Sequence, residues 1–145
     1  MIETIARGVC IKSGQILLCQ TKGAPIRYLP GGHVEFGEGA RQALEREITE
    51  ELALDSTAGD FLGMVEHHFL QKGERHSEWN AVFMLDIPGL EPGEEVAAAE
   101  DHISFEWCAL DKIAGSGLEP DVLCGLLAGW AADRLPPQRW VKSGL

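Results

Sequence analysis

The stretch GHVEFGEGARQALEREITEELAL, residues 32–54, decides how this sequence can fold and where its chemistry lies. Its second half is typical of a helix, and three carboxylates, Glu47, Glu50 and Glu51, recur in it at spacings of three and four residues. Like charges at these spacings face one another on a helix and repel. Such a cluster is tolerated when a cation lies among the carboxylates, and hard oxygen ligands suit Mg²⁺ or Mn²⁺. The stretch therefore predicts a metal site on a helix.

The predicted helix runs from about residue 38 or 39 to about residue 53. An α-helix turns by about 100° per residue, so the three carboxylates share one stripe about 100° wide. The apolar stripe contains Leu44, Ile48 and Leu52, and it lies directly beside the acidic stripe. Ordinary solvated glutamates would lie opposite, as Glu45 does. The carboxylates are therefore expected to line a groove at the edge of the core, with Glu45 facing solvent.

Arg46 is predicted to hold one of these carboxylates in place. It lies one helical turn before Glu50, at the margin of the acidic stripe. A guanidinium is planar and binds carboxylates in a fork, so it would fix the rotamer of a neighbouring glutamate. A surface helix with surplus glutamate is the competing interpretation. The sequence Leu-Pro-Gly-Gly at residues 29–32 and Glu38 further on favour the metal site, because a plain surface helix requires neither.

Residues 32–54 resemble the box of the Nudix hydrolases, G-x5-E-x7-R-E-U-x-E-E-x-G-U, in which U is a bulky aliphatic residue. One position departs from it, because Ala53 stands where the box has its last glycine. That glycine normally ends the helix in a turn that favours a positive φ, so the departure concerns the helix end and not the carboxylates. The matching positions are Gly32, Glu38, Arg46, Glu47, Ile48, Glu50, Glu51 and Leu54.

The resemblance implies an α/β fold, an α/β/α sandwich built on a mixed β-sheet, with residues 1–145 forming one domain. It also implies hydrolysis of a nucleoside diphosphate linked to another moiety, with water attacking a phosphorus and Mg²⁺ or Mn²⁺ as the cofactor. By similarity the metal ligands are Glu47, Glu50 and Glu51, and the catalytic residues are these three and Arg46. The identity of the general base and the number of metal ions stay open.

The resemblance further implies that Gly31 and Gly32 shape the loop before the helix and that Glu38 supports the site. Arg7 lies in the first predicted strand and Arg27 in the strand before the glycine turn. In the family's fold both positions lie near the pocket and could grip phosphate, but a surface arginine on an edge strand is an equally good interpretation. The expected substrate-binding residues are Arg7, Arg27, Gly31, Gly32 and Glu38.

The composition is ordinary for a globular chain, with 145 residues of which 45% are hydrophobic and 24% charged. A formal net charge of −11 disfavours DNA or RNA polymers, whose binding depends on basic patches, but does not exclude a single nucleotide. No apolar run approaches the roughly 20 residues of a membrane span, and the N-terminus lacks the pattern of a signal peptide. We therefore expect a cytoplasmic protein that binds neither a membrane nor polymeric nucleic acid.

Alternation of apolar and polar residues predicts most of the remaining elements as strands. It is clearest in residues 76–87, where Ala81, Phe83 and Leu85 face one way and Val82 the other. An apolar helix is expected at residues 121–132, ended by Pro136 and Pro137. The expected strands are residues 4–12, 15–20, 27–29, 33–36, 57–70, 76–87 and 103–109, with the fifth broken at Gly59 and Gly63.

Some polar residues outside the box are weaker candidates for the site. Glu78 and Asn80 share one face of their strand and could reach a ligand, although alternation alone supports this weakly. His67 is interpreted as an ordinary strand histidine. Glu100 and Asp101 precede the last strand. In several members of the family an acid from this loop reaches the metal, but the neighbouring acids make a solvated loop the slightly better interpretation.

We expect a Mg²⁺-dependent hydrolase of a small (deoxy)nucleoside triphosphate or a related nucleotide, because the chain is compact. The alternative enzyme is an ADP-sugar or dinucleotide pyrophosphatase. A non-catalytic ligand sensor with this fold would usually have lost box carboxylates, and all four are present. A structural metal-binding domain would need no glycine loop before the helix. The sequence leaves the oligomeric state open, and a homodimer is one expectation because dimers are common in the family.

Overall fold

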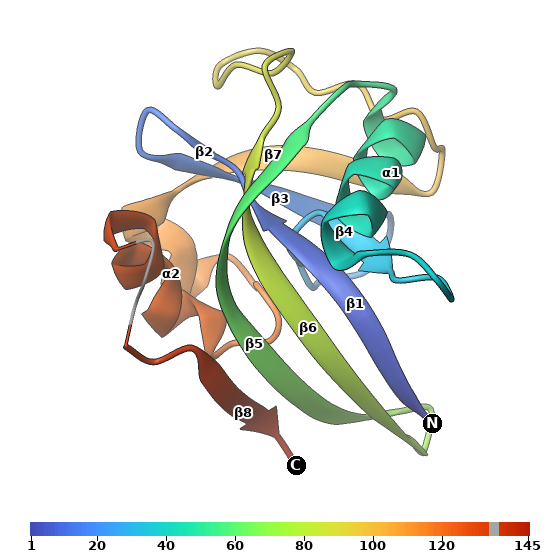
Figure 1. The fold of residues 1–145 in the computed structure, drawn as a ribbon. Coiled ribbons are helices and arrows are strands. Elements are labelled where there is room, and N and C mark those ends of the chain that lie inside the picture. The colour runs from blue at the N-terminus through green and yellow to red at the C-terminus, as the bar shows by residue number, and fades with distance from the viewer. Residues whose placement is uncertain (134–136) are drawn as a thin grey trace.

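The computed structural model of the protein describes residues 1–133 and 137–145 and contains two β-sheets in these ranges. The larger sheet consists of β1 (Ile2–Val9), β4 (Gly31–His33), β5 (Thr57–Gln71), β6 (Glu74–Asp86) and β8 (Trp140–Gly144). Their order is β4-β1-β6-β5-β8 (Figure 1). Strand β1 is parallel to β6 and β8 is parallel to β5, whereas β4 is antiparallel to β1 and β5 to β6. The sheet is therefore mixed, as expected.

A smaller antiparallel sheet and the helices complete the fold. The smaller sheet has the order β2-β3-β7 and packs beside the larger one. No helix in the described ranges is long and apolar enough to cross a membrane. The remaining elements are β2 (Ile11–Lys12), β3 (Gln15–Thr21), β7 (Ile103–Ala109), the helices α1 (Ala40–Leu52) and α2 (Leu123–Ala132), and the 3₁₀ helix η1 (Leu110–Gly115).

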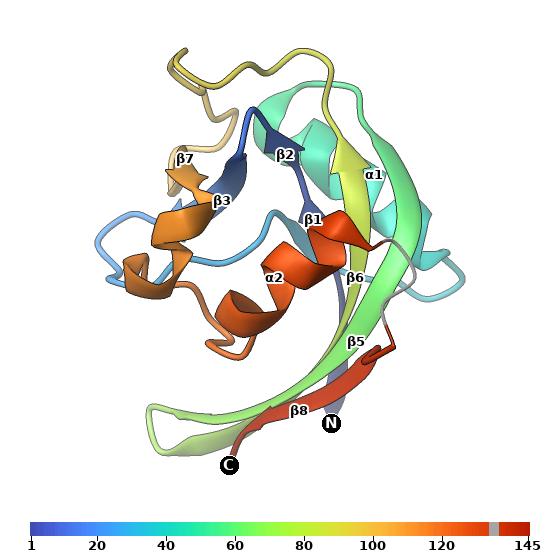
Figure 2. The ribbon, with the colours of Figure 1, turned by 90° about the vertical axis from the view of Figure 1, so that its left-hand side faces the viewer.

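The two α-helices lie on opposite sides of the larger sheet, with α2 in front of it and α1 behind it in Figure 2. The core is accordingly divided into two clusters. Ala81, Phe83 and Leu85 of β6 pack in the cluster that contains α1. Val82 packs in the cluster that contains α2. The alternation predicted for this strand and the expected α/β/α sandwich are thereby confirmed.

Helix α1 buries the predicted apolar stripe, because Leu44, Ile48 and Leu52 are all buried. The expectation that Glu45 faces solvent is wrong. Glu45 is half-buried, and its Oε2 accepts a hydrogen bond of 2.9 Å from the backbone N–H of Ala58 at the start of β5. This residue therefore ties the outer side of α1 to the sheet instead of carrying a solvated charge.

Three strand predictions differ from the structure. The short strand after the glycine turn lies at Gly31–His33 and not at 33–36, because the glycines themselves pair with β1. Residues 27–29 form only isolated bridges, and β5 continues through Gly59 and Gly63 with shifts of register. Strand β8 was not predicted. Of the two prolines expected to end the second helix, Pro136 lies outside the described residues.

Gly31 explains why the turn before α1 requires glycine. Its φ is +139°, and a Cβ built on it would lie 1.9 Å from the carbonyl oxygen of Ala6. Any side chain would therefore force β4 away from β1, where Gly31 pairs with Arg7. The close pairing of these two strands holds the loop that leads into α1.

The end of α1 has the conformation that the missing glycine would adopt easily. Ala53 is in the left-handed region, with φ 55° and ψ 36°, and its N–H donates to the carbonyl oxygen of Thr49. A residue with a Cβ is strained there by about 1 kcal/mol relative to glycine. The fold thus keeps the family's helix end although the residue differs.

We predict that Ala53→Gly stabilises the protein by about 0.5–1 kcal/mol, because glycine adopts this conformation without strain. The measurement is the midpoint of thermal or urea unfolding. Ala128→Gly, at an exposed position inside α2, is the matched control and should destabilise by a similar amount because it loosens a helix interior. Destabilisation by both substitutions would show that Ala53 is not strained.

Candidate metal and substrate site

Arg46 is the centre of the polar network on α1. Its Nε and Nη2 donate to the two carboxylate oxygens of Glu38 over 2.7 and 3.0 Å. Its Nη1 donates to Glu47 over 3.0 Å and to Glu50 over 3.2 Å. Its Nη2 also donates to the carbonyl oxygen of His33 over 3.0 Å. One guanidinium therefore fixes two helix carboxylates and the loop before the helix.

Glu38 is held as an anion by this contact. Hydrogen bonds from Arg46, assisted by the backbone N–H of Glu35, lower the pKa of Glu38 to about 2. The same contacts raise the pKa of Arg46, so this pair stays charged at any ordinary pH. The structure thus places Glu38 as the clamp of Arg46, behind the carboxylates. Its expected role in substrate binding remains a prediction.

Glu51 is the buried member of the acidic stripe. Its side chain is only 9% exposed, and within the described residues its Oε2 has no hydrogen-bond partner. Burial raises the pKa of Glu51 to about 8, and the charges of Glu47 and Glu100 act in the same direction, whereas Arg7 opposes them. An unpaired buried carboxylate oxygen is costly unless a ligand satisfies it. A cation beside Glu51 and Glu47 would remove that cost.

Gly32 creates the space in which Glu47 lies. A Cβ at this position would be 2.4 Å from the Cδ of Glu47, so a side chain here would displace the carboxylate. The two glycines before α1 consequently have different roles. Gly31 allows the strand pairing, and Gly32 lets the carboxylate of Glu47 pack against the loop backbone.

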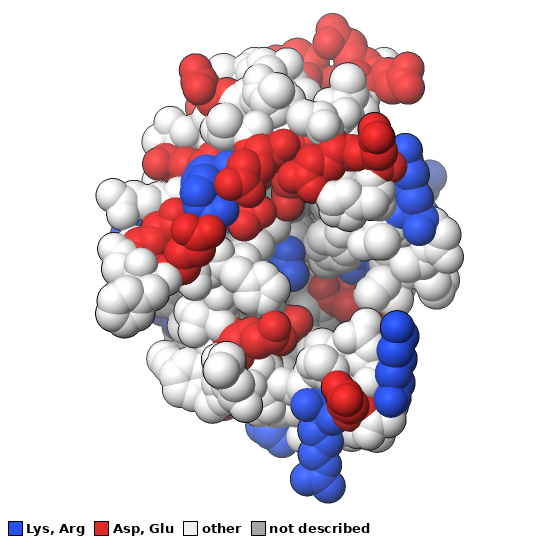
Figure 3. Space-filling model, turned by 90° about the vertical axis from the view of Figure 1, so that its right-hand side faces the viewer, with Lys and Arg blue, Asp and Glu red and all other residues white. Residues whose placement is uncertain are grey.

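The donor set fits a divalent metal ion. Glu47, Glu50 and Glu51 present hard carboxylate oxygens along one stripe, which is the chemistry that Mg²⁺ and Mn²⁺ prefer. No three acidic, histidine or cysteine side chains among the described residues already converge as a ready-made ion site. The carboxylates of Glu47 and Glu50 are instead turned toward Arg46, which donates a hydrogen bond to one oxygen of each. Figure 3 shows acidic side chains gathered in a band across this face, beside a hollow.

A cavity of about 440 Å³ lies on the α2 side of the larger sheet. Two of the weaker candidates from the sequence, Glu78 and Asn80, line it. No pattern in the sequence pointed to Glu119 and Pro120 as cavity residues, because they precede α2 and reach the cavity from a distant part of the chain. The lining residues are Arg7, Ile26, Tyr28, His67, Phe69, Gln71, Glu78, Asn80, Glu119 and Pro120.

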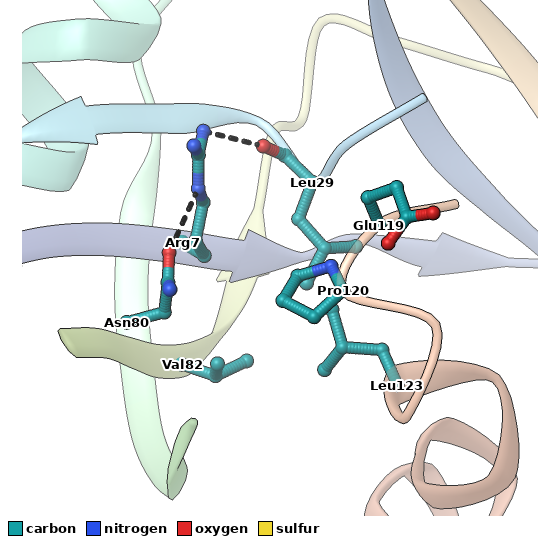
Figure 4. Close-up of a pocket in the computed structure, with 7 residues that line it drawn as sticks. All are labelled: Arg7, Leu29, Asn80, Val82, Glu119, Pro120 and Leu123. Carbon is teal, nitrogen blue, oxygen red and sulfur yellow. Dashed lines mark hydrogen bonds between the residues drawn. The ribbon is translucent and has the colours of Figure 1, made fainter. Parts of the chain in front are cut away.

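Arg7 is half-buried in the lining of this cavity. Its Nη1 donates to the carbonyl oxygen of Leu29 over 3.0 Å, and its Nε contacts Oδ1 of Asn80 at 3.5 Å (Figure 4). Burial lowers the pKa of Arg7, and the charges of Glu78 and Glu51 oppose this shift. Arg7 is therefore within electrostatic reach of both the cavity and the acidic stripe, where a phosphate group would connect them.

Arg27 is placed differently from Arg7. Its Nε forms an ion pair with Glu106 of β7, and its Nη1 donates to the carbonyl oxygen of Pro25 over 3.1 Å. It is not among the residues that line the cavity. The structure thus brings Arg7 to the candidate site and engages Arg27 elsewhere, and a phosphate contact by either stays a prediction.

The family model for the NUDIX domain matches residues 3–123, which include the whole of α1 and all the residues that line the cavity. The chain belongs to the Nudix family. Because it keeps all four box carboxylates, it is a Nudix pyrophosphohydrolase. The enzyme departs from the family's box only at Ala53, away from the carboxylates.

Two relatives are similar over much of the enzyme. The CTP pyrophosphohydrolase of Escherichia coli (strain K12) is 31% identical over 124 residues, which cover 83% of this chain and 84% of the relative. The ADP-ribose pyrophosphatase of Methanocaldococcus jannaschii is 35% identical over 112 residues, which cover 74% of this chain and 63% of the relative. These relatives act on different nucleotides, so likeness alone does not select a substrate.

Solved structures show the same fold. The MutT protein from Methanosarcina mazei Go1 has a TM-score of 0.67 at 22% identity, covering 90% of this chain and 94% of that one. A NUDIX hydrolase from Nitrosomonas europaea has a TM-score of 0.64 at 19% identity, covering 94% of each chain. At these identities the likeness concerns the fold and carries no information on the ligand.

We predict that Arg46→Lys lowers kcat by at least about tenfold with little change in KM, because an ammonium cannot replace the planar fork on Glu38 while holding Glu47 and Glu50. Steady-state kinetics at saturating Mg²⁺ measure this. Arg41→Lys, on the same helix but bound to the carbonyl oxygen of Gly59, is the control and should be near wild type. A normal kcat with a raised KM would mean that Arg46 contacts substrate instead.

Glu50→Gln and Glu51→Gln should each lower kcat by about 10²-fold or more, the scale of one lost acid–base or electrostatic contact. Both variants should also bind Mn²⁺ more weakly in calorimetric titrations. The folded state should survive, since each change removes one of several repelling charges. Glu45→Gln changes the same charge on the same helix and keeps an oxygen for the N–H of Ala58, so it is the control. Equal losses at Glu45 and Glu51 would refute the assignment.

Proposed function

We propose that the enzyme uses Mg²⁺ or Mn²⁺ to hydrolyse a pyrophosphate bond of a nucleotide, with a small (deoxy)nucleoside triphosphate as the substrate. The observation that carries this proposal is the acidic stripe of Glu47, Glu50 and Glu51, in which a buried oxygen of Glu51 lacks a partner. A pyrophosphate brings several negative charges, and the stripe would repel it unless cations lay between them. The same stripe would therefore hold the metal and, through it, position the phosphates.

Each protein group has a distinct part in the proposed reaction. When bound, the metal neutralises phosphate oxygens and lowers the pKa of water. Arg46 keeps Glu47 and Glu50 aimed through its hydrogen bonds, and Glu38 keeps Arg46 in place. A carboxylate oxygen of the stripe accepts the proton of the attacking water. Arg7, which is half-buried and interacts electrostatically with Glu51, offers its positive charge to a phosphate oxygen.

The shape and lining of the cavity favour a nucleotide whose nucleoside end carries no further charged group. Its volume of about 440 Å³ and its aromatic side chains suit a nucleoside. Among the described residues its polar lining includes Glu78 and Glu119 but only one arginine or lysine, Arg7. The negative charge of a second phosphorylated group would be repelled by these carboxylates, whereas an uncharged base can donate hydrogen bonds to them. This favours a nucleoside triphosphate over a large diphosphate conjugate.

An ADP-sugar is the second candidate, because an ADP-ribose pyrophosphatase is among the relatives. The two candidates differ in which end of the substrate enters the cavity. A sensor without catalysis is disfavoured, since the carboxylate network around Arg46 is complete.

A hydrolysis panel tests this proposal. Nucleoside triphosphates, ADP-ribose and a dinucleoside polyphosphate are each incubated with Mg²⁺, with Mn²⁺ and with excess EDTA. We expect turnover of at least one triphosphate to a monophosphate and pyrophosphate, none in EDTA, and weak activity with Ca²⁺, which does not share the tight octahedral preference of Mg²⁺. Isotopically labelled water identifies the phosphorus that is attacked.

Three outcomes would contradict the proposal in different ways. Undiminished turnover in EDTA would show that the reaction does not require a divalent metal ion. Turnover of ADP-ribose with no turnover of any triphosphate would select the second candidate. Binding of nucleotides without any hydrolysis would indicate a sensor. Glu51→Gln serves as the negative control for contaminating phosphatases in every arm.

A further inference from the structure

We infer that Glu119 selects the base of the substrate, and that the base it favours is guanine. This inference rests on the proposed function, because it concerns the cavity next to the acidic stripe. Its starting point is the position of a carboxylate that the Nudix box does not include, in a cavity where the rest of the charge is already balanced.

The loop that carries Glu119 is fixed in place. The backbone N–H of Glu119 donates to the carbonyl oxygen of Arg27 over 2.8 Å, and the N–H of Arg27 donates to Gly117 over 2.9 Å. The N–H of Leu118 donates to Oγ of Ser116 over 3.2 Å. The two contacts with Arg27 join the loop to the segment before β4, so the backbone of Glu119 is held at the cavity wall before any ligand arrives. Figure 4 shows Glu119 and Pro120 on the opposite side of a small neighbouring pocket from Arg7 and Asn80.

Glu119 is a half-buried carboxylate whose oxygens are unused. In the described ranges, no hydrogen bond or ion pair is formed by its side chain, although it lines the cavity. Glu78 differs from it, because Nδ2 of Asn80 lies 3.4 Å from its carboxylate and its charge interacts with Arg7. A partly desolvated carboxylate without a donor is unfavourable, so a ligand that brings donors gains from this site.

No lysine or arginine among the described residues forms an ion pair with Glu119. Arg7 interacts mainly with Glu78 and Glu51. Burial lowers the pKa of His67, whereas the charges of Glu78 and Glu119 oppose the shift. When a substrate displaces water from the cavity, its N–H groups can donate to Glu119.

The chemistry of a carboxylate selects among the bases. An ionised carboxylate only accepts hydrogen bonds, and its two oxygens bind best to two adjacent N–H donors. Guanine offers such a pair at N1–H and the 2-amino group. Adenine and cytosine place an acceptor beside their amino group, uracil flanks its N–H with carbonyls, and hypoxanthine lacks the 2-amino group. Tyr28 and Phe69 also line the cavity, where the guanidinium of Arg7 lies over the Tyr28 ring and Phe69 stacks on His67.

The edge read by Glu119 is common to several guanine nucleotides. GTP, dGTP and 8-oxo-dGTP share N1–H and the 2-amino group and differ in the sugar or at C8. The inference therefore concerns the guanine edge, and a comparison of these three triphosphates identifies which of them the remaining walls admit.

The decisive measurement compares GTP with ITP, which differ only in the 2-amino group. For the wild-type enzyme with Mg²⁺, kcat/KM should be at least about tenfold higher for GTP, the scale of one hydrogen bond to a charged group. Glu119→Gln should reduce this ratio to within about threefold, since an amide replaces one acceptor by a donor. ATP, CTP and UTP should be poorer substrates than GTP, and dGTP and 8-oxo-dGTP complete the panel.

Two further variants keep the test specific. Asp121→Asn removes a charge two residues away at an exposed position outside the cavity lining, and should leave the ratio unchanged. Glu119→Asp keeps the carboxylate and should retain a preference for GTP, which excludes a general loss of folding as the cause. Calorimetric binding of GMP and IMP in metal-free buffer should show the same preference and its loss in Glu119→Gln.

The outcomes separate this inference from the proposed function. Equal kcat/KM for GTP and ITP, a preference for another base, or a ratio unaltered in Glu119→Gln would overturn the role of Glu119 while hydrolysis itself stands. No hydrolysis of any nucleotide would overturn the proposed function, and the GMP and IMP titrations would still decide whether the cavity reads the guanine edge.

Discussion

The four-way contact of Arg46 is the constraint on which the site depends. Three glutamates on one stripe repel each other, and a helix that carries them would not hold their side chains in one arrangement unaided. The guanidinium of Arg46 binds Glu47 and Glu50 and is itself clamped by Glu38 and the loop before α1. Gly32 leaves room for this packing, and Gly31 lets the loop pair tightly with β1. The glycines and the arginine thus serve the same end.

Glu51 and Arg7 connect the two halves of the site. Glu51 is buried at the edge of α1 with an oxygen that has no partner among the described residues, and Arg7 is half-buried in the lining of the cavity. Burial disfavours the charged form of both groups, and each opposes the shift of the other. This arrangement places negative charge where cations and phosphates are proposed to bind. It leaves the rest of the cavity to a base, whose recognition then depends on polar groups such as Glu119.

Local pattern was sufficient to predict much of this molecule. The 3.6-residue period predicted the buried and acidic stripes of α1, and alternation predicted both faces of β6. The same methods misplaced β4, missed β8 and assigned Glu45 to solvent. Each of these errors concerns a partner far away in the sequence. Strand β4 is defined by pairing with β1, β8 by pairing with β5, and Glu45 by an N–H at the start of β5.

The sequence by itself determined the family, the acidic stripe and the pairing of Arg46 with a carboxylate, because these depend on spacing within one helix and the loop before it. Only the tertiary structure decided which carboxylate is buried, which of the two arginines reaches the cavity, and where Glu119 lies. Those properties depend on how β1, β5, β6 and the loop before α2 meet in space. The spacing of residues along the chain does not predict how these segments pack together, because their packing arises from burial and hydrogen bonds between distant parts of the sequence.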